Sequence, residues 1–418
     1  MDKLIIDGGR PLAGLVRVSG AKNSVLPILA ATILAEGPVQ LRNVPELRDV
    51  STMAKLLEEM GAVTSSAEEY KVDASSLSSF RAPYELVKTM RASFLVLGPL
   101  LTKYGKAEVS LPGGCAIGAR PVNLHIKGLE AMGAKIQVES GYVKARAPQG
   151  LKGAEIFLEI ASVGATENLI MAAVLAEGKT VIHNAAEEPE ITDLINFLMK
   201  MGAKISGAGT SVVEIEGVRS LRSISHSIIG DRVEAGTFLI AGAALGGEIE
   251  VQGFDPNHLT VVLEKLKMSG ANLEISQDSV KLGMSLSRPE PVDIETGVYP
   301  GFPTDMQAQY MVLNCIASGK SVIQERIFEN RFLHVQELSR LGAVIELRGN
   351  STAVVTGVNK LTAAQVMATD LRASSSLVIA ALMAQGKTVI DRIYHIDRGY
   401  EAIEHKIRAL GGFIERAS

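Results

Sequence analysis

The chain has 418 residues, 47% of them hydrophobic, which is enough for two or three domains that each have a full core. A formal charge of -4, 4% aromatic residues and no Trp argue against a nucleic-acid binder, which needs a basic surface and stacking side chains. Two distant cysteines, no hydrophobic leader and no apolar run of roughly 20 residues predict a cytoplasmic protein without disulfides or membrane insertion.

Six similar units of about 70 residues follow one another along the chain. Motifs such as "EAMGAK" recur around one series of glycines, and motifs such as "LAEGKTVI" recur around a second series that interleaves with the first. The first series is Gly61, Gly133, Gly202, Gly270, Gly342 and Gly411, and the second is Gly37, Gly105, Gly178, Gly246, Gly319 and Gly386.

The third unit shows the predicted order of elements. Residues 165–178 form a helix of small apolar residues, whose closing glycine suits a left-handed C-cap. A β-branched strand at 179–182 follows, then an amphipathic helix at 190–202 with a second glycine stop, and a hairpin at 202–218. Because the small-residue helices are apolar nearly all round, we expect them to be buried, with sheets and amphipathic helices around them.

The two ends of the chain are predicted to meet. The sixth unit lacks its last strand, and residues 3–12 resemble the closing strands at 213–221 and 353–361. We therefore expect an α/β protein with two three-unit domains, residues 21–229 and residues 230–418 plus 1–20, with the active site in a cleft between them.

Charged or polar residues begin the small-residue helices, about 14 residues before the closing glycine. They are Lys22, Arg91, Arg232, Asp305 and Arg372, with Ser162, Val163 and Gly164 in the third unit. A cation at a helix N-terminus opposes the helix dipole, so an anion should compensate. Asp231 and Asp370 could instead neutralise Arg232 and Arg372, and both interpretations stay open there. Lys22 and Arg91 have no such neighbour in sequence, which favours anion binding.

Four units place an arginine at nearly the same point of the loop after the second glycine series: Arg48, Arg120, Arg331 and Arg398. A recurrent arginine facing helix N-termini suits a clamp for phosphate or carboxylate. The loop of the second unit is longer, and its extra residues contain Cys115. This thiol is either a small apolar group or a reactive one that Arg120 activates. Cys315, in an apolar helix, is expected to be buried and inert.

Asp305 occupies a position where other units carry cations. It could be a favourable helix-start residue or, in a cationic cleft, the general base. The sequence contains no Walker loop, no G-x-G-x-x-G after an opening strand, no H-E-x-x-H and no Cys/His ligand pair. We therefore expect neither a metal nor a cofactor.

Seven motifs along the whole length, in order, resemble the UDP-N-acetylglucosamine 1-carboxyvinyltransferase family of enolpyruvyl transferases. They are "SGAKNSVLPILAA", "LPGGCAIGARPVNLH", "ASVGATEN", "GFPTDMQAQ", "IFENRF", "TDLRASSSL" and "YHIDRGYE". The resemblance implies a two-domain inside-out α/β barrel of six βαβαββ units. It also implies transfer of the enolpyruvyl group of phosphoenolpyruvate to the 3-hydroxyl of UDP-N-acetylglucosamine, with release of phosphate, at the first committed step of peptidoglycan synthesis.

The resemblance also implies roles for individual residues. Lys22, Arg120 and Arg398 would hold phosphoenolpyruvate, Cys115 would protonate it or add to it, and Asp305 would accept the proton of the sugar hydroxyl. Sensitivity of Cys115 to the epoxide antibiotic fosfomycin is implied as well. Candidate positions for binding the UDP-sugar and its surroundings are Asn23, Arg91, Arg120, Pro121, Val122, Asn123, Leu124, Ser162, Val163, Gly164, Ile327, Arg331, Asp370 and Arg372.

One departure and two alternatives remain. Ile160 stands where some family members have a lysine near the nucleotide, which weakens that contact. A 5-enolpyruvylshikimate-3-phosphate synthase would share the fold and the chemistry, but its "LGNAGT"-type motif does not occur in this sequence. A non-catalytic repeat scaffold is compatible with the repeats, although the Cys115 loop and Asp305 argue against it.

Overall fold

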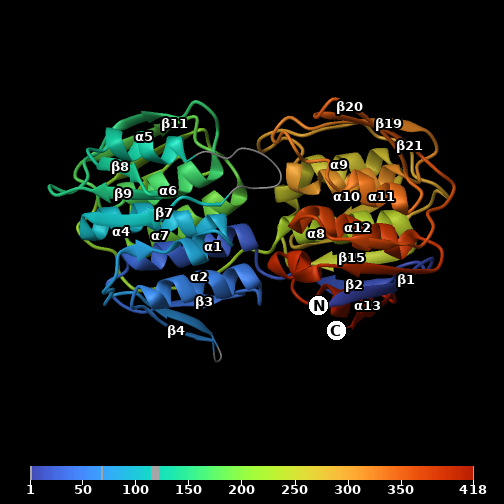
Figure 1. Ribbon diagram of the computed structural model, residues 1–418, viewed down its shortest axis with the longest axis horizontal. Helices are drawn as coiled ribbons and strands as arrows, with labels where there is room; N and C mark the ends of the chain where they lie inside the picture. The colour runs from blue at the N-terminus through green and yellow to red at the C-terminus, as the bar shows by residue number, and fades with distance from the viewer. Residues whose placement is uncertain (1, 67–68, 114–121, 418) are drawn as a thin grey trace. The chain divides into compact units, whose positions relative to one another are not determined.

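The computed structural model describes residues 2–66, 69–113 and 122–417. This part of the chain forms two compact units, each with its own hydrophobic core (Figure 1). The N-unit contains residues 20–113 and 122–229, and the C-unit contains residues 2–19 and 230–417.

Three four-stranded sheets of one design build the N-unit. In each, a short edge strand lies parallel to the second strand, and a hairpin continues the sheet antiparallel. The sheet orders are β14-β3-β5-β4, β6-β7-β9-β8 and β10-β11-β13-β12. Their bounds are β3 Val39–Arg42, β4 Val63–Ser66, β5 Tyr70–Asp73, β6 Arg81–Ala82, β7 Lys106–Ser110, β8 Lys135–Glu139, β9 Tyr142–Arg146, β10 Glu155–Phe157, β11 Lys179–His183, β12 Lys204–Ser206, β13 Val212–Glu216 and β14 Ser225–Ser227.

The C-unit repeats this design. Its sheet orders are β2-β15-β17-β16, β18-β19-β21-β20 and β22-β23-β1-β24. The bounds are β1 Lys3–Asp7, β2 Gly14–Arg17, β15 Glu248–Gln252, β16 Ala271–Ile275, β17 Ser279–Met284, β18 Ile294–Glu295, β19 Lys320–Gln324, β20 Val344–Arg348, β21 Thr352–Thr356, β22 Gln365–Met367, β23 Lys387–Asp391 and β24 Phe413–Ala417. The six sheets confirm the βαβαββ repeat.

The N-terminal strand completes the sixth sheet, as the sequence predicts. Strand β1 lies antiparallel between β23 and β24, and Ile6 is opposite both Thr388 and Ile414. The sequence did not predict the sheet partners of two short edge strands, although both lie in the domains it assigned them to. Strand β2, just before residue 20, pairs with β15 of the C-unit. Strand β14, just before residue 230, pairs with β3 of the N-unit.

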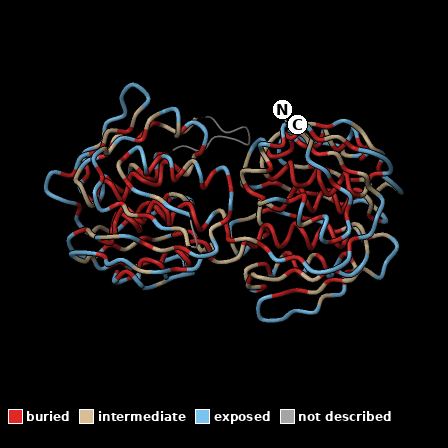
Figure 2. The backbone as a smooth tube through the Cα atoms, turned by 90° about the horizontal axis from the view of Figure 1, so that it is seen from below, coloured by how far each residue is buried: buried red, intermediate tan, exposed pale blue. Residues whose placement is uncertain are grey.

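The small-residue helices form the interior of each unit, and nearly all of their residues are buried (Figure 2). In the N-unit they are α1 (Lys22–Ala31), η2 with α4 (Arg91–Val96 and Leu97–Tyr104) and α6 (Val163–Ala173). In the C-unit they are α8 (Arg232–Leu245), η4 with α10 (Thr304–Met306 and Gln307–Asn314) and α12 (Leu371–Met383). This arrangement confirms the expectation of buried helices surrounded by sheets.

The amphipathic helices lie farther out and turn one face to solvent. They are α2 (Arg48–Glu59), α5 (Asn123–Ala131), α7 (Pro189–Met201), α9 (Thr260–Met268), α11 (Val335–Arg340) and α13 (Ile403–Ala409). Shorter helical turns are η1 (Thr32–Leu34), α3 (Tyr84–Val87), η3 (Pro256–Leu259) and η5 (Ile393–Arg398). Within the described ranges, no helix is both long and apolar enough to cross a membrane.

The predicted glycine stops hold for the amphipathic helix α7 and for the inner helix α4, whose C-cap Gly105 has φ of 70°, but not for the inner helix α6. Gly202 caps α7 in the left-handed region, with φ of 113°, as expected. The inner helix predicted at 165–178 instead ends at Ala173, because the chain tightens there and Ala176 N–H donates to the carbonyl of Ala173. Gly178, with φ of 90°, lies in the connection to β11 rather than at the helix end.

Candidate active site

The first turn of α1 presents Lys22, which is ion-paired to the neighbouring helix. Nζ of Lys22 lies 2.9 Å from Oδ2 of Asp49, in the first turn of α2, and the Asp49 side chain is only 4% exposed. The fold thus supplies a carboxylate that the sequence around Lys22 does not show. Helix α1 has no capping side chain and no acidic residue in its first turn, so its N-terminus keeps its positive polarity. Together with Lys22 and the exposed Asn23, this end of α1 suits an anion.

A second polar group of the N-unit surrounds the start of α6. Oγ of Ser162 accepts a hydrogen bond of 3.4 Å from the N–H of Ala165 and caps this helix. One turn further on, the side-chain amide nitrogen of Asn168 lies 3.0 Å from Nδ1 of His125. Burial, and then the positive charge of Arg91, lower the pKa of His125 to about 3. His125 is therefore a neutral hydrogen-bonding group at neutral pH.

His125 also links the predicted sugar-binding segments of the N-unit. It lies in the first turn of α5, next to Leu124, which is buried, and Asn123, which is exposed. A Cβ atom placed on Gly164 would come within 3.4 Å of the His125 ring, so the start of α6 lies against it. Val122 precedes the helix and is 9% exposed, and Val163 is half-buried.

In the C-unit, Asp305 lies at the start of η4 between two buried guanidinium groups. Oδ1 of Asp305 accepts from Nη2 of Arg331 at 2.8 Å, and Oδ2 accepts from Nε of Arg372 at 3.0 Å. The two arginine side chains are 6% and 5% exposed, whereas the Asp305 side chain is 29% exposed. An ionised carboxylate has about four acceptor sites on its two oxygens, so Asp305 can accept from more than one donor at a time. Arg331, which the sequence suggested for an anion clamp, and Arg372, a helix-start cation, hold Asp305 in this structure.

Arg372 is fixed by more than Asp305. Its guanidinium lies 5.5 Å from the centre of the Tyr400 ring. Burial alone would lower the pKa of Arg372, but Asp305, Tyr400 and Asp231 outweigh burial and raise it. The hydroxyl of Tyr400 is 2.9 Å from that of Thr237. Nη1 of Arg372 is buried and has no hydrogen-bond partner in the described part of the chain.

The pairing suggested in sequence between Arg372 and Asp370 is wrong, because Asp370 has another task. Its carboxylate caps α12 by accepting the N–H groups of Arg372 and Ala373, both at 3.0 Å. Asp231 caps α8 in the same way, and Arg232 lies over the ring of Tyr299, 5.4 Å from its centre. Both acids therefore stabilise helix starts, as N-cap residues do.

Asp370 also acts on two histidines that lie near Arg331 and Arg398. Burial lowers the pKa of His334 to about 4, Asp370 opposes this effect and Arg331 adds to it. Burial followed by Arg398 lowers the pKa of His395, and Asp370 opposes this shift too. Hydrogen bonds join Asp305, Arg331 and Arg372 in one charged region of the C-unit, and the effects on His334 and His395 indicate that Asp370 and Arg398 lie near it.

Glu325 is a member of this region that the sequence did not suggest. Its buried carboxylate accepts the hydroxyl groups of Thr296 and Thr304, both at 2.8 Å, and the N–H groups of Ile327 and Phe328 at 2.8 and 3.2 Å. It thereby joins the residue before Asp305 to the loop that contains Ile327. A single glutamate after an apolar strand gives no sequence signal for such a role.

Known proteins match this chain over nearly its whole length. The model of the family described as EPSP synthase (3-phosphoshikimate 1-carboxyvinyltransferase) matches residues 6–407. Proteins named UDP-N-acetylglucosamine 1-carboxyvinyltransferase from Shewanella amazonensis and Shewanella halifaxensis are 59% and 58% identical, over 100% of this chain and 100% and 99% of theirs. The chain belongs to the EPSP synthase family of enolpyruvyl transferases.

Solved structures agree with membership of the EPSP synthase family. The enolpyruvyl transferase NikO from Streptomyces tendae matches with a TM-score of 0.89 and 25% identity, over 100% of this chain and 99% of that chain. EPSP synthase from Acinetobacter baumannii has the same fold, with a TM-score of 0.77 and 17% identity over the full length of both chains.

The remaining residues that the sequence singled out differ in what the structure shows of them. Cys115, Arg120 and Pro121 lie outside the described residues, so their predicted roles stay predictions. Arg48, the first residue of α2, is exposed, and Ile160 is 65% exposed in the loop before α6. Cys315 is fully buried, and burial raises the pKa of its thiol to about 12, which agrees with an inert side chain. The described residues contain no group of three His, Cys, Asp or Glu side chains placed to hold a metal ion.

Proposed function

We propose that this protein transfers the enolpyruvyl group of phosphoenolpyruvate to the 3-hydroxyl of UDP-N-acetylglucosamine and releases phosphate. The observation that carries the proposal is the 57–59% identity, over the whole chain, to relatives that bear the corresponding name. The charged groups around Lys22 and Asp305 support it, because both substrates are polyanionic. The proposal includes that this reaction serves peptidoglycan synthesis and takes place in the cytoplasm.

The proposed reaction is an addition followed by an elimination. The sugar oxygen bonds to C2 of phosphoenolpyruvate, the sugar hydroxyl gives up its proton, and the C3 methylene gains a proton and becomes a methyl group. In the second step the C2–O bond to phosphate breaks and the methyl group loses a proton, which restores the double bond. The reaction therefore needs a base for the hydroxyl, an acid for C3 and positive charge at the phosphate.

We assign roles in this reaction to residues of both units. Asp305 accepts the hydroxyl proton, because its carboxylate is the partly exposed acid among the buried cations of the C-unit. Cys115 protonates C3 or adds to C2. Lys22, Arg120 and Arg398 neutralise phosphoenolpyruvate, and Arg331, Asp370 and Arg372 hold Asp305 and its surroundings. The UDP-sugar is assigned to Asn23, Arg91, Arg120 to Leu124, Ser162 to Gly164, and Ile327.

A phosphate-release assay tests the proposal. The purified protein is mixed with phosphoenolpyruvate and one acceptor, either UDP-N-acetylglucosamine or shikimate-3-phosphate, and a third sample has no acceptor. We expect release with the UDP-sugar alone. Release with shikimate-3-phosphate would favour the other family activity, and no release with either acceptor would favour a binding scaffold.

A further inference from the structure

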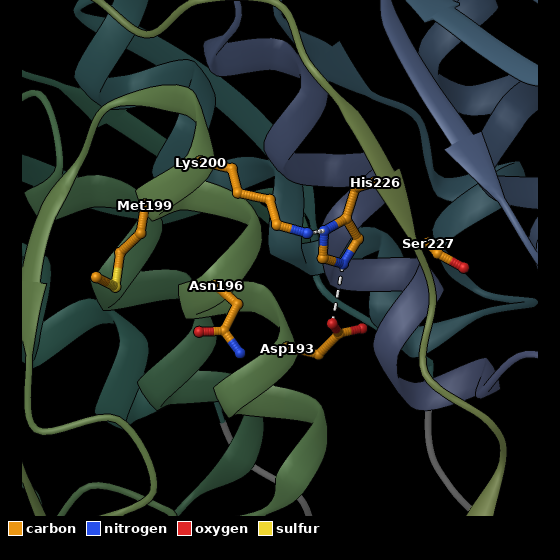
Figure 3. A pocket seen from close by; sticks show the side chains of 6 residues that line it. All are labelled: Asp193, Asn196, Met199, Lys200, His226 and Ser227. Carbon is orange, nitrogen blue, oxygen red and sulfur yellow. Dashed lines mark hydrogen bonds and ion pairs between the residues drawn. The ribbon is translucent and has the colours of Figure 1, made fainter. Parts of the chain in front are cut away.

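A buried hydrogen-bonded chain connects the surface of the N-unit to the start of α1. Lys200 and Asp193 lie on α7, His226 lies on β14, and all three line one surface pocket (Figure 3). Nζ of Lys200 is 3.2 Å from Nδ1 of His226, and Nε2 of His226 is 2.9 Å from Oδ1 of Asp193. His226 and Asp193 are 3% and 4% exposed, while Lys200 is exposed.

The contact with Lys200 determines which nitrogen of His226 carries its hydrogen. An ammonium group can only donate, so Nδ1 accepts from Lys200 and the ring hydrogen lies on Nε2. Nε2 then donates to Asp193. The two hydrogen bonds therefore run in one direction, from the exposed amine of Lys200 through the His226 ring to the buried carboxylate of Asp193.

The other oxygen of Asp193 holds the chain on both sides of the α1 start. Oδ2 accepts the hydroxyl of Ser24 and, at 3.3 Å, the backbone N–H of Ile229. The carbonyl of Ile229 in turn accepts the N–H of Ala21 at 2.7 Å. One buried carboxylate thereby anchors the residues before and after Lys22 and Asn23. Asp49 holds the Lys22 ammonium from the side of α2.

We propose that Asp193 and His226 are positioning residues that fix the first turn of α1, so that Lys22 meets phosphoenolpyruvate. This inference rests on the proposed function, because it assigns Lys22 to phosphoenolpyruvate. Helix α1 has no side-chain cap of its own, and the orientation of its first turn therefore depends on the contacts of Ala21 and Ser24. A buried carboxylate with several donors is well suited to this task, because each lost donor leaves it partly unpaired.

The test compares Ser24→Ala and His226→Leu with His226→Gln. Ser24→Ala removes one donor from Asp193, and His226→Leu removes another. His226→Gln keeps an amide N–H that can reach the carboxylate. We expect the first two changes to raise the KM for phosphoenolpyruvate roughly five- to tenfold, with the KM for UDP-N-acetylglucosamine within about twofold. His226→Gln should restore most of the affinity.

His183→Gln is the matched control, because His183 forms a hydrogen bond of 3.0 Å to Glu155 outside this chain of contacts. It should leave both KM values unchanged. A purely structural role of Asp193 and His226 would lower the amount of active enzyme and hence the apparent kcat, with both KM values unchanged. That result, or no effect of Ser24→Ala and His226→Leu, would overturn the proposal.

Hydrogen–deuterium exchange separates this proposal from the proposed function. The amides of residues 21–26 should exchange faster in Ser24→Ala and His226→Leu than in the wild type, and at wild-type rate in His226→Gln. Unchanged exchange in all variants would refute the positioning role even in an active enzyme. If the wild-type protein released no phosphate, the proposed function would be refuted, whatever the exchange experiment showed.

Discussion

At the scale of single residues, groups from other elements hold the candidate side chains: Asp49 pairs with Lys22, and two arginines bind Asp305. Sequence position predicted that Lys22, Asp305 and Arg372 begin inner helices, and the structure places each of them at a helix start. It did not reveal Asp49 or Glu325, because their contacts come from other elements and leave no local pattern. The sequence predicted the chemistry of the helix starts, while the groups that hold these side chains needed the fold.

Asp305→Asn should lower turnover about 100-fold or more, because an amide cannot accept the sugar proton. Binding of UDP-N-acetylglucosamine, measured by calorimetry, should remain. The control is Glu346→Gln, which removes a carboxylate paired with Arg348 at 3.0 Å on the exposed surface and should leave turnover unchanged. Turnover of Asp305→Asn near the wild-type rate would remove Asp305 from the mechanism.

The two thiols should differ sharply in reactivity. Burial raises the pKa of Cys315 to about 12, so it is a protonated, inaccessible thiol at neutral pH. We expect fosfomycin to modify Cys115 alone, as seen by mass spectrometry of peptides, and to abolish turnover. Cys115→Ala should be inactive and Cys315→Ala active. Equal labelling of both cysteines in the folded protein would argue against an activated Cys115.

At the scale of elements, the repeats predicted the order of strands and helices and the burial of the inner helices. They did not predict the sheet partners of β2 and β14, because edge strands of three or four residues carry too little pattern to specify a partner. The inner helix α6 also ends earlier than its glycine suggests, since a tighter turn precedes that glycine, whereas α4 ends at Gly105 as predicted. Helix ends and strand partners depend on contacts that a local pattern does not contain.

The contact between α4 and α6 is close enough to require a glycine. A Cβ atom at Gly98 would lie 2.4 Å from the backbone carbonyl oxygen of Asn168. Gly98→Ala should therefore destabilise the N-unit by about 1–3 kcal/mol, as overpacking does. The measurement is urea unfolding, and Gly283→Ala is the control, because no atom lies within 4 Å of its added Cβ. Equal stability of Gly98→Ala and the wild type would contradict the close approach.

The buried His125, which lies between α5 and α6, should make the free energy of unfolding depend on pH. Burial and Arg91 lower the pKa of His125 from 6.5 to about 3, so the unfolded chain binds a proton that the folded chain does not. The free energy of unfolding therefore falls as pH decreases below about 6.5, by about 2 kcal/mol at pH 5. In His125→Asn this part of the pH dependence should disappear. Identical slopes of the unfolding midpoint against pH in the wild type and in His125→Asn would contradict this prediction.

At the scale of the whole molecule, the first residues belong with the last ones. Strand β1 is an inner strand of the sixth sheet, and Leu4 and Ile6 are fully buried in the C-unit core. Ile6→Asp should therefore unfold the C-unit, with loss of exchange protection in residues 230–417 and with protection of residues 20–113 retained. Loss of protection in both units together would show that their stabilities are coupled.

The most direct test of the account is the identity and amount of the products. Purified protein with phosphoenolpyruvate and UDP-N-acetylglucosamine should release one phosphate for each UDP-sugar that gains the mass of an enolpyruvyl group, measured by mass spectrometry. Asp305→Asn and Cys115→Ala should give neither product at a comparable rate. Phosphate release without a modified UDP-sugar, or modification of shikimate-3-phosphate instead, would contradict the account.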